Sequence, residues 1–276
     1  MQLNEFYNIA KTFAPKTLSD EYCAKFGAYD NSGILLRTGE DIKGALFSLD
    51  FSLAAIEKAI EVGANVIVTH HPAIYGGVSA IDVDAVSPLG KKLALCLKNG
   101  ISVISMHLNL DGATGGIDEC LANGICLCAA RAAGQTTAKM VCVPTIRDVL
   151  QTGGYGRVYN VPFVSAKALA KEMEKEFSTK RIQIYENTDK PITRVASFCG
   201  GGADEAAIEF AIKNNAQAVV SSDFKHHVLT LAAETGVSVI ALTHYASENY
   251  GFKKYYEKIR QKAGVPCVYH TDENML

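Results

Sequence analysis

Two stretches of the sequence, 54-AAIEKAIEVGANVIV-68 and 206-AAIEFAIKNNAQAVV-220, match each other and decide the fold. Eight of their fifteen aligned positions are identical. A second pair, 92-KLALCLKNGISVI-104 and 228-VLTLAAETGVSVI-240, follows in the same order with six identities in thirteen positions. Each stretch has the pattern of an amphipathic helix that leads into a short apolar strand. The sequence therefore predicts an internal duplication.

The segments around these stretches extend the pattern in both halves. In the first half, strands are expected at 45-ALFSLD, 66-VIV and 101-ISVISM, with helices at 53-LAAIEKAIEVG and 89-LGKKLALCLKNG between them. In the second half, strands are expected at 195-VASF, 218-AVV and 237-VSVIAL, with helices at 204-DEAAIEFAIKNN and 227-HVLTLAAETG. This alternation predicts an α/β fold of two interlocked units with largely parallel sheets.

The chain is expected to have three parts. Residues 1–130 form the first α/β half and residues 193–276 form the second. The segment 131–192 has a different texture, with the glycine-rich turn 153-GGYGR and the charged helix 165-SAKALAKEMEKEF. Ser165 is a suitable N-cap for that helix. We expect this middle segment to be a small α/β element rather than a linker.

Composition restricts the class of protein. The chain has 276 residues, of which 48% are hydrophobic, with 27 Lys and Arg against 29 Asp and Glu. Because nucleic-acid binders usually carry a strong basic excess, a nucleic-acid partner is not expected. No apolar run approaches the roughly 18 residues of a membrane span, and the N-terminus lacks a signal-peptide core, so a cytoplasmic protein is expected. The eight cysteines include no C-x-x-C pair, and we interpret them as reduced, apolar core residues.

Histidines gather at the ends of the predicted strands. Six of the seven follow a strand closely: His70, His71, His107, His226, His227 and His244. Ligands of parallel α/β sheets bind beyond the carboxyl ends of the strands. We therefore expect strand ends from both halves to face one crevice, and we interpret the remaining His270 as a surface residue.

Carboxylates accompany these histidines at short spacings. The pairs are His107-x-x-x-Asp111, Asp223-x-x-His226 and His244-x-x-x-Glu248. Imidazole and carboxylate together suit zinc, iron or manganese ions. Residues four apart share a helix face and can hold one ion, whereas His70 and His71 are expected to diverge on an extended strand, one for each of two ions. The pattern predicts a two-metal site with a bridging carboxylate.

Two glycine-containing stretches remain open to interpretation. The run 200-GGGAD opens a helix, where backbone N–H groups can hold a phosphate, although a tight turn is the favoured explanation. Position 205 is Glu, which excludes the dinucleotide fingerprint G-x-G-x-x-G. The stretch 30-DNSG is also expected to be a turn, with Asn31 able to reach a ligand.

The chain resembles the NIF-three-like proteins, a family of type-2 GTP cyclohydrolase I homologues known as hexamers with two metal ions per chain. The resemblance rests on 30-DNSG, 69-THHP, 107-HLNLDGATGGID, 154-GYGRV, 189-DKPITRVASFCGGGAD, 222-SDFKHH and 243-THYASE. These motifs span nearly the whole chain in the family's order. The short middle segment is similar to that of the compact members, which lack the large central insertion.

The resemblance implies two divalent ions held by His70, His71, Asp111, His244 and Glu248, with Glu248 bridging both ions. It places three further residues close by, as catalytic candidates or in contact with the ligands: His107, Asp223 and His226. Two positions depart from the family pattern. Tyr29 stands where the family often has Trp, and Ser222 replaces a glycine, which narrows the expected pocket.

The family name implies opening of the guanine ring of GTP by water, with loss of formate and formation of a dihydroneopterin triphosphate. In that reaction, His226 or His107 would move the proton, and Lys225 with the turn at 200 would hold phosphate. Two alternatives stay open at this stage. One is another metal-dependent hydrolase that acts on a phosphoester or nucleotide, and the other is a non-enzymatic metal-handling or interaction scaffold. The resemblance also implies a homohexamer.

Overall fold

The computed structural model describes the whole chain except residues 79, 85, 87, 136–143 and 187–190. The chain divides into two compact units, each made of discontinuous stretches. Unit 1 comprises residues 1–113 and 252–271, and unit 2 comprises residues 114–251 and 272–276. The three parts expected from the sequence are continuous stretches of the chain, whereas these two units are not. Apolar periodicity predicts a helix but does not show which unit that helix joins.

Unit 1 is built on a five-stranded sheet with the order β1-β4-β3-β2-β11. Its strands are β1 (Gly33–Leu36), β2 (Ala45–Ser48), β3 (Val66–Thr69), β4 (Ser102–Ser105) and β11 (Cys267–His270). The four strands from β4 to β11 are parallel, and β1 joins the edge in the antiparallel sense. The expected parallel sheet is therefore present in this half of the molecule.

Both faces of the unit 1 sheet are buried, because successive side chains of a strand point to opposite faces. Leu46 belongs to the core that includes α3 (Leu53–Glu61) and α4 (Leu89–Lys98). The next residue, Phe47, packs on the other face, 6.5 Å from Phe6 and 6.2 Å from Phe252 between ring centroids. These partners belong to α1 (Leu3–Phe13) and to the second half of α10 (His244–Arg260). Unit 1 also contains α2 (Lys16–Phe26) and the single turn α5 (Leu108–Asp111).

Unit 2 is built on a six-stranded sheet with the order β5-β6-β8-β9-β10-β7. Its strands are β5 (Thr145–Val149), β6 (Gly154–Val164), β7 (Gln183–Tyr185), β8 (Ile192–Ser197), β9 (Ala218–Ser221) and β10 (Ser238–Ala241). Only β8, β9 and β10 are mutually parallel, so this sheet is mixed rather than largely parallel. The short connection from β5 to β6 forces an antiparallel pair, since a parallel pair needs a long crossover.

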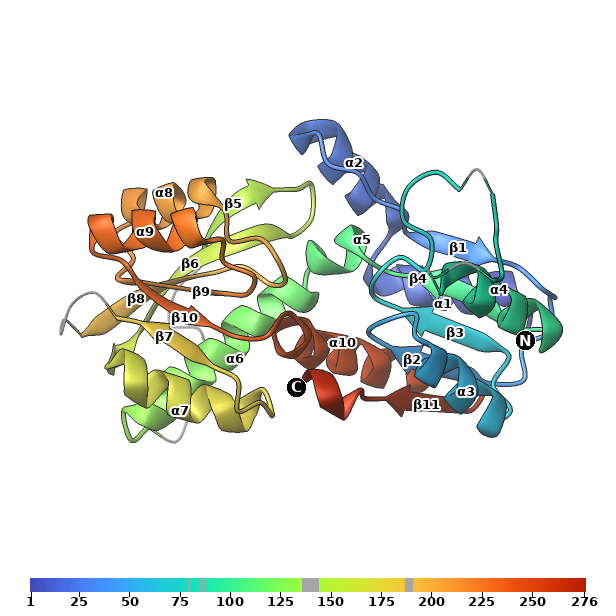
Figure 1. Cartoon of the computed structure of the whole chain (residues 1–276). Helices are drawn as coiled ribbons and strands as arrows, with labels where there is room; N and C mark the ends of the chain where they lie inside the picture. The colour runs from blue at the N-terminus through green and yellow to red at the C-terminus, as the bar shows by residue number, and fades with distance from the viewer. Residues whose placement is uncertain (79, 85, 87, 136–143, 187–190) are drawn as a thin grey trace. The chain divides into compact units, whose positions relative to one another are not determined.

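Helices cover the unit 2 sheet on two sides (Figure 1). One side carries α6 (Ile117–Ala132) and α7 (Ala166–Glu176), and the other carries α8 (Glu205–Lys213) and α9 (His226–Thr235). Ser165 caps α7 as expected, because its hydroxyl accepts from the Ala168 N–H. Asp204 caps α8 in the same way, through the Ala207 N–H. A short 3₁₀ turn, η1 (Glu273–Met275), follows near the C-terminus.

The same topology occurs in both units, as the repeated stretches predict. The series β2-α3-β3-α4-β4 in unit 1 corresponds to β8-α8-β9-α9-β10 in unit 2, and in each sheet the three strands are neighbours in chain order. The helix after β10, α10, begins in unit 2 and ends in unit 1. The helix that follows the unit 1 strands, α6, lies in unit 2. The two units therefore share the residues of α10 between them along the chain.

The cysteines of the described residues agree with the expectation of reduced core residues. Seven of them form no disulfide, and Cys96, Cys120, Cys126, Cys128 and Cys199 are buried. Burial raises the pKa of the Cys96 and Cys128 thiols to about 12, which keeps them protonated. Cys142 lies outside the described residues. Within the described part of the chain, every helix is too short or too polar to cross a membrane.

Candidate metal centre

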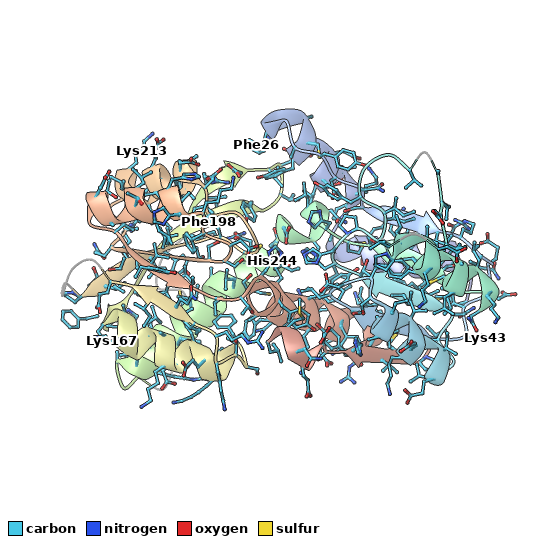
Figure 2. All side chains as sticks on the ribbon, in the orientation of Figure 1. Phe26, Lys43, Lys167, Phe198, Lys213 and His244 are labelled. Atoms are coloured by element: carbon cyan, nitrogen blue, oxygen red, sulfur yellow. The ribbon has the colours of Figure 1, made fainter. Side chains whose placement is uncertain are left out.

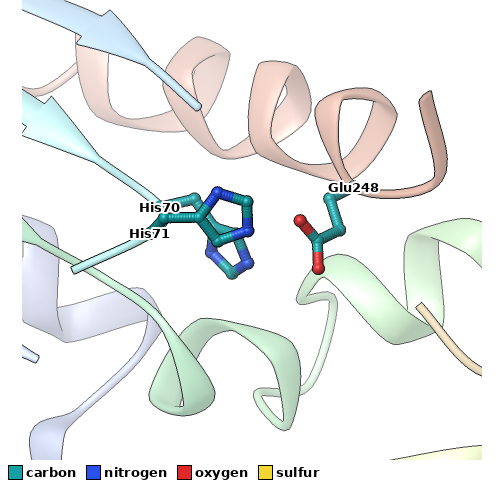
Figure 3. A group of neighbouring side chains, drawn as sticks. All are labelled: His70, His71 and Glu248. Atoms are coloured by element: carbon teal, nitrogen blue, oxygen red, sulfur yellow. The ribbon is translucent and has the colours of Figure 1, made fainter. Parts of the chain in front are cut away.

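Two histidines follow β3 in unit 1, and their rings lie close together. The backbone N–H groups of His70 and His71 both donate to the Leu49 carbonyl, at 3.1 and 3.0 Å. The two ring centroids are 4.9 Å apart (Figure 3). The expectation that these side chains diverge is wrong, because both residues lie past the end of the strand, in a bend that removes the alternation.

A third histidine and an aspartate join this group from the next strand end. His107 precedes α5, and its carbonyl accepts from the Asp111 N–H, which closes one helical turn. Ligand atoms of His70, His107 and Asp111 all lie within 4.8 Å of one another. The His70 Nε2 atom is 3.5 Å from Asp111 Oδ1. Two ligands on one tetrahedral zinc ion lie about 3.4 Å apart, so this spacing fits a shared ion.

Each of the three imidazoles is held through its Nδ1 atom. For His70 the partner is the Met106 carbonyl at 2.8 Å, so Nδ1 carries the proton, because a carbonyl only accepts. His71 Nδ1 lies 2.7 Å from Asp50 Oδ1. His107 Nδ1 lies 2.8 Å from Asp30 Oδ1. This arrangement leaves the Nε2 atom of each ring for a ligand, as in carboxylate–histidine–metal sites.

Asp30 is a supporting residue that the sequence analysis did not select. Burial would raise the pKa of its carboxyl, but hydrogen bonds from His107 and Ser32 outweigh burial and hold the pKa at about 2. The Ser32 hydroxyl lies 2.6 Å from Asp30 Oδ2 and accepts from the His107 N–H at 3.0 Å. The stretch 30-DNSG is thus a turn, as expected, whose first residue holds His107 in place.

Asp50 is a second residue that the sequence analysis missed. It is the last residue of the expected strand 45-ALFSLD, and the observed strand β2 ends two residues before it, at Ser48. The same rule that selected the histidines, a polar residue at a strand end, applies to it. Its role became visible only with the contact to His71, which lies 21 residues further along the chain.

Unit 2 provides a second group of donors at the start of α10. His244 begins this helix (Figure 2), and the Glu248 carboxylate projects from the next turn (Figure 3). His244 Nε2 lies 3.1 Å from Glu248 Oε2, so the two residues share a helix face as the spacing predicts. The carboxylate of Asp223 contacts the Nδ1 atom of His244. The role of Asp223 within unit 2 is therefore the role that Asp50 has within unit 1.

The glycine run at 200–202 is a tight turn that packs against these donors. A Cβ on Gly200 would lie 2.1 Å from Glu248 Oε1, and one on Gly202 would lie 1.8 Å from the Tyr155 hydroxyl. The Gly200 N–H donates to the Ser247 hydroxyl at 3.0 Å. Ser222, the residue that departs from the family pattern, is buried and donates to the Gly200 carbonyl at 2.6 Å. Ser222 therefore fastens the turn that faces Glu248.

The remaining candidates differ in burial. His226 begins α9 and is exposed, as is Lys225 before it. His227 pairs with Glu205, with 2.7 Å between Nε2 and Oε1. His270 ends β11 and is half-buried rather than a surface residue, because β11 pairs with β2 inside unit 1. The roles of His226 and Lys225 stay predictions.

Comparisons with known proteins agree with the resemblance. The sequence model of the family described as Duf34/NIF3 (NGG1p interacting factor 3) matches residues 1–274. A "GTP cyclohydrolase 1 type 2 homolog" of Clostridium acetobutylicum is 26% identical over 250 residues, which cover 90% of this chain and 85% of the relative. A "Protein NIF3 homolog" of Schizosaccharomyces pombe is 26% identical over 230 residues, covering 80% of this chain and 78% of the relative.

Solved structures show the same fold. Reduced HcgD from Methanocaldococcus jannaschii has a TM-score of 0.76 and 26% sequence identity, covering 98% of this chain and 97% of that chain. A Bacillus cereus protein related to NIF3 has a TM-score of 0.77 at 19% identity, covering 99% and 98% of the two chains. The second likeness concerns the fold alone.

Proposed function

We propose, on the premise that this chain belongs to the Duf34/NIF3 family, that it is a metal-dependent hydrolase with two divalent ions per chain. The ions would be held by the unit-1 donor set (His70, His71, His107 and Asp111) and the unit-2 donor set (His244 and Glu248). Zinc, iron and manganese all suit this mixture of imidazole and carboxylate.

The observation that carries this proposal is the way the imidazoles are held. His71, His107 and His244 each have a carboxylate at Nδ1, and His70 has a backbone carbonyl. Four histidines oriented through the same ring atom leave the same atom, Nε2, for a ligand. Such partners fix the tautomer and raise the basicity of metal-binding histidines.

Helix α10 carries Glu248, the proposed bridging ligand of the two ions. It is a continuous helix from His244 to Arg260, and Glu248 precedes Phe252 by about one turn. The Phe252 ring packs within unit 1, 6.1 Å from the ring of His70. Phe252 and His70 belong to unit 1, whereas Glu248 belongs to unit 2, so the proposal that Glu248 bridges both ions rests on the family resemblance.

The bound ions would supply Lewis acidity and lower the pKa of the water that attacks the substrate. The protein would supply proton transfer and orientation. His226 is exposed at the start of α9, three residues after Asp223, and is suited to move a proton. In this proposal His107 binds a metal ion instead, so the proton transfer that the sequence also allowed for it falls to His226. Asp223 would act through His244, as a positioning residue.

The reaction that we propose is hydrolytic opening of a purine nucleotide ring, GTP to a dihydroneopterin triphosphate with release of formate. Support comes from the names of curated relatives, which are called GTP cyclohydrolase 1 type 2 homologs. A phosphoester or nucleotide substrate of another kind would use the same ions and is the alternative that the substrate test must separate.

Metal analysis after anaerobic purification and reconstitution tests the metal centre. We expect about two ions per chain in the wild type and about one in His244→Ala, because His70, His107 and Asp111 remain. Glu257→Ala is the matched control, since Glu257 lies on the same helix and pairs with Arg260 at the surface. A wild-type content below about half an ion per chain would contradict the proposal.

A substrate screen with the reconstituted protein tests the reaction. Release of formate from GTP that is abolished in Glu248→Ala supports the cyclohydrolase. Release of phosphate without formate supports another hydrolase. His226→Ala should keep both ions and lose about 10²–10⁴-fold in turnover, with His227→Ala as the control. Full metal content without any turnover would favour a metal-handling scaffold.

The oligomeric state is a separate proposal. The family resemblance supports a homohexamer. Light scattering at micromolar concentration should give about six times the mass of the chain, 29.6 kDa. A stable monomer would contradict it.

A further inference from the structure

Unit 1 has a pocket of about 610 Å³ whose lining includes no member of the unit-1 donor set. Its walls come from α1, from Lys16 at the start of α2, and from residues 31–35, where the 30-DNSG turn leads into β1. This volume is within the range of small-molecule sites, roughly 300–1,000 Å³.

The first wall is the polar face of α1. Leu3, Phe6 and Ala10 are buried in the core of unit 1. The opposite stripe has the helical spacing i, i+3, i+4 and i+7, and it lines the pocket with Asn4, Tyr7, Asn8 and Lys11. Two amides, a phenol and an ammonium group thus face the pocket from one helix.

The charged side chains that line the pocket are both cationic, in a protein whose net charge is −2. Lys11 and Lys16 are among its ten lining residues, and none of those ten carries a carboxylate. Burial raises the pKa of the Tyr7 phenol, so the hydroxyl remains protonated and can donate. The hydrogen bond to Asp20, at 2.5 Å, raises the pKa of Lys16 and keeps it charged.

The second wall is the turn before β1, which is held by hydrogen bonds to residues that do not line the pocket. Asn31 Nδ2 donates to the Ile74 carbonyl at 2.7 Å, and the Ser32 hydroxyl is bonded to Asp30 at 2.6 Å. Gly33 has φ +134, and a Cβ there would lie 3.6 Å from the Tyr7 hydroxyl. Glycine therefore keeps the space in front of Tyr7 open, in a backbone conformation that other residues rarely adopt.

We propose that this pocket binds the phosphate group of a small phosphorylated molecule. Two ammonium groups, three amides and a phenol supply donors on several sides of one cavity, which suits an anion with several acceptor oxygens. The volume exceeds the roughly 30 Å³ that one water molecule occupies, so it leaves room for an organic group beside the phosphate. The proposal goes beyond the metal-dependent reaction, because the pocket needs no metal ion.

The pocket shares one residue with the support of the unit-1 donor set. Ser32 lines the pocket, and its hydroxyl also accepts from the His107 N–H at 3.0 Å. A phosphate bound beside Ser32 would therefore lie behind the turn that positions His107. This connection would let the ligand influence the metal centre without contacting it.

Calorimetric titration of metal-stripped protein tests the proposal, since the absence of metal removes binding of phosphate to the ions. The probes are inorganic triphosphate, guanosine monophosphate and guanosine. We expect saturable binding of inorganic triphosphate and of guanosine monophosphate, and at least tenfold weaker binding of guanosine. Lys11→Gln and Lys16→Gln should each weaken phosphate binding about tenfold. Higher ionic strength should weaken it further.

The ion pairs on α2 provide matched controls. Lys25 pairs with Glu21 at 2.5 Å, as Lys16 pairs with Asp20, and both lysine side chains are 49% exposed. Lys25→Gln should leave affinity unchanged, and Asp20→Asn should raise it about threefold by releasing Lys16. Equal affinity in all variants, no saturable binding of either phosphate, or equal binding of guanosine and its monophosphate would overturn the proposal. Activity assays of the metal-loaded enzyme do not enter this test, so its outcome is separate from that of the hydrolase.

Discussion

In unit 1 the candidate metal donors stand on loops that follow strands, whereas in unit 2 they stand on a helix. His70 and His71 follow β3, and His107 follows β4. In the equivalent series of unit 2, the loop after β8 is a glycine turn and the loop after β9 carries Ser222 and Asp223. The donors His244 and Glu248 lie one turn apart on α10.

The difference shows that two units of the same topology can carry metal donors on different kinds of element. Unit 1 places three imidazoles by backbone turns, and it supports them with Asp30, Asp50 and the Met106 carbonyl. Unit 2 relies on the regular spacing of a helix, so it needs space beside that helix. The Gly200 turn supplies this space, because any side chain there would meet Glu248.

The largest expected effect concerns the buried ion pair of unit 2 between Asp118 and Arg157, which lies beside the glycine turn at 200–202. Asp118 contacts Arg157 and accepts from the N–H groups of Gly156 at 3.0 Å and Cys199 at 3.2 Å. Asp118→Asn leaves the buried Arg157 guanidinium with only the Glu119 carboxylate, 3.7 Å away, and should lower the free energy of unfolding by about 3–5 kcal/mol in urea titrations.

The control for Asp118 is a surface pair of the same unit. Glu172→Gln breaks a pair with Lys175 on α7 and should leave the free energy of unfolding nearly unchanged, because solvent screens this pair. If Asp118→Asn cost less than about 1 kcal/mol, the turn would not depend on this pair.

Gly200→Ala tests the need for space beside α10. Its φ of 56° is unfavourable for alanine, and the new Cβ would clash with Glu248. We expect a loss of about 2–3 kcal/mol in the free energy of unfolding, together with a lower metal content. Gly236→Ala is the control, because its φ is 75° but nothing lies within 4 Å, so strain alone should cost about 1 kcal/mol. Similar metal contents in the two variants would refute the role of the turn.

Asp30→Asn tests the support of His107 through pH. The folded state lowers the pKa of Asp30 from 3.8 to about 2, so this carboxylate stabilises the protein above about pH 4. That contribution is about 2 kcal/mol, since the Asp30 side chain is only 2% exposed in the folded state and solvent screens it little. It is lost as the pH falls toward 2, where the carboxylate becomes protonated in the folded state as well. Unfolding of metal-free protein should show the difference between wild type and variant at pH 5 and little difference at pH 2. An equal difference at both pH values would contradict the assignment.

The smallest expected effect compares the matching carboxylates of the two units. Asp50→Asn and Asp223→Asn should each weaken metal binding about tenfold in competition with a chelator. We expect the lower end of the usual range because these side chains are 43% and 55% exposed. Glu205→Gln, which alters the contact of His227, is the control. A loss confined to one variant would show that the units do not support their donors alike.

The sequence by itself determined much of the fold. The repeated stretches predicted α3, β3, α8 and β9, because apolar periodicity and helix caps act within a few residues. Most of the second pair, α4 with β4 and α9 with β10, followed for the same reason. The mixed sheet of unit 2 was not predicted, since the middle segment did not reveal which edge its strands would join.

The donors of the candidate site were also selected from the sequence, by their places after strands and by the four-residue spacing of His244 and Glu248. What tertiary structure alone decided are the contacts that hold those donors. Asp50 meets His71 across 21 residues, and Asp30 meets His107 across 77. The closeness of Gly200 to Glu248 also joins residues far apart in the chain. Local patterns carry no information about such pairs, because the packing of sheets and helices brings them together only in the folded chain.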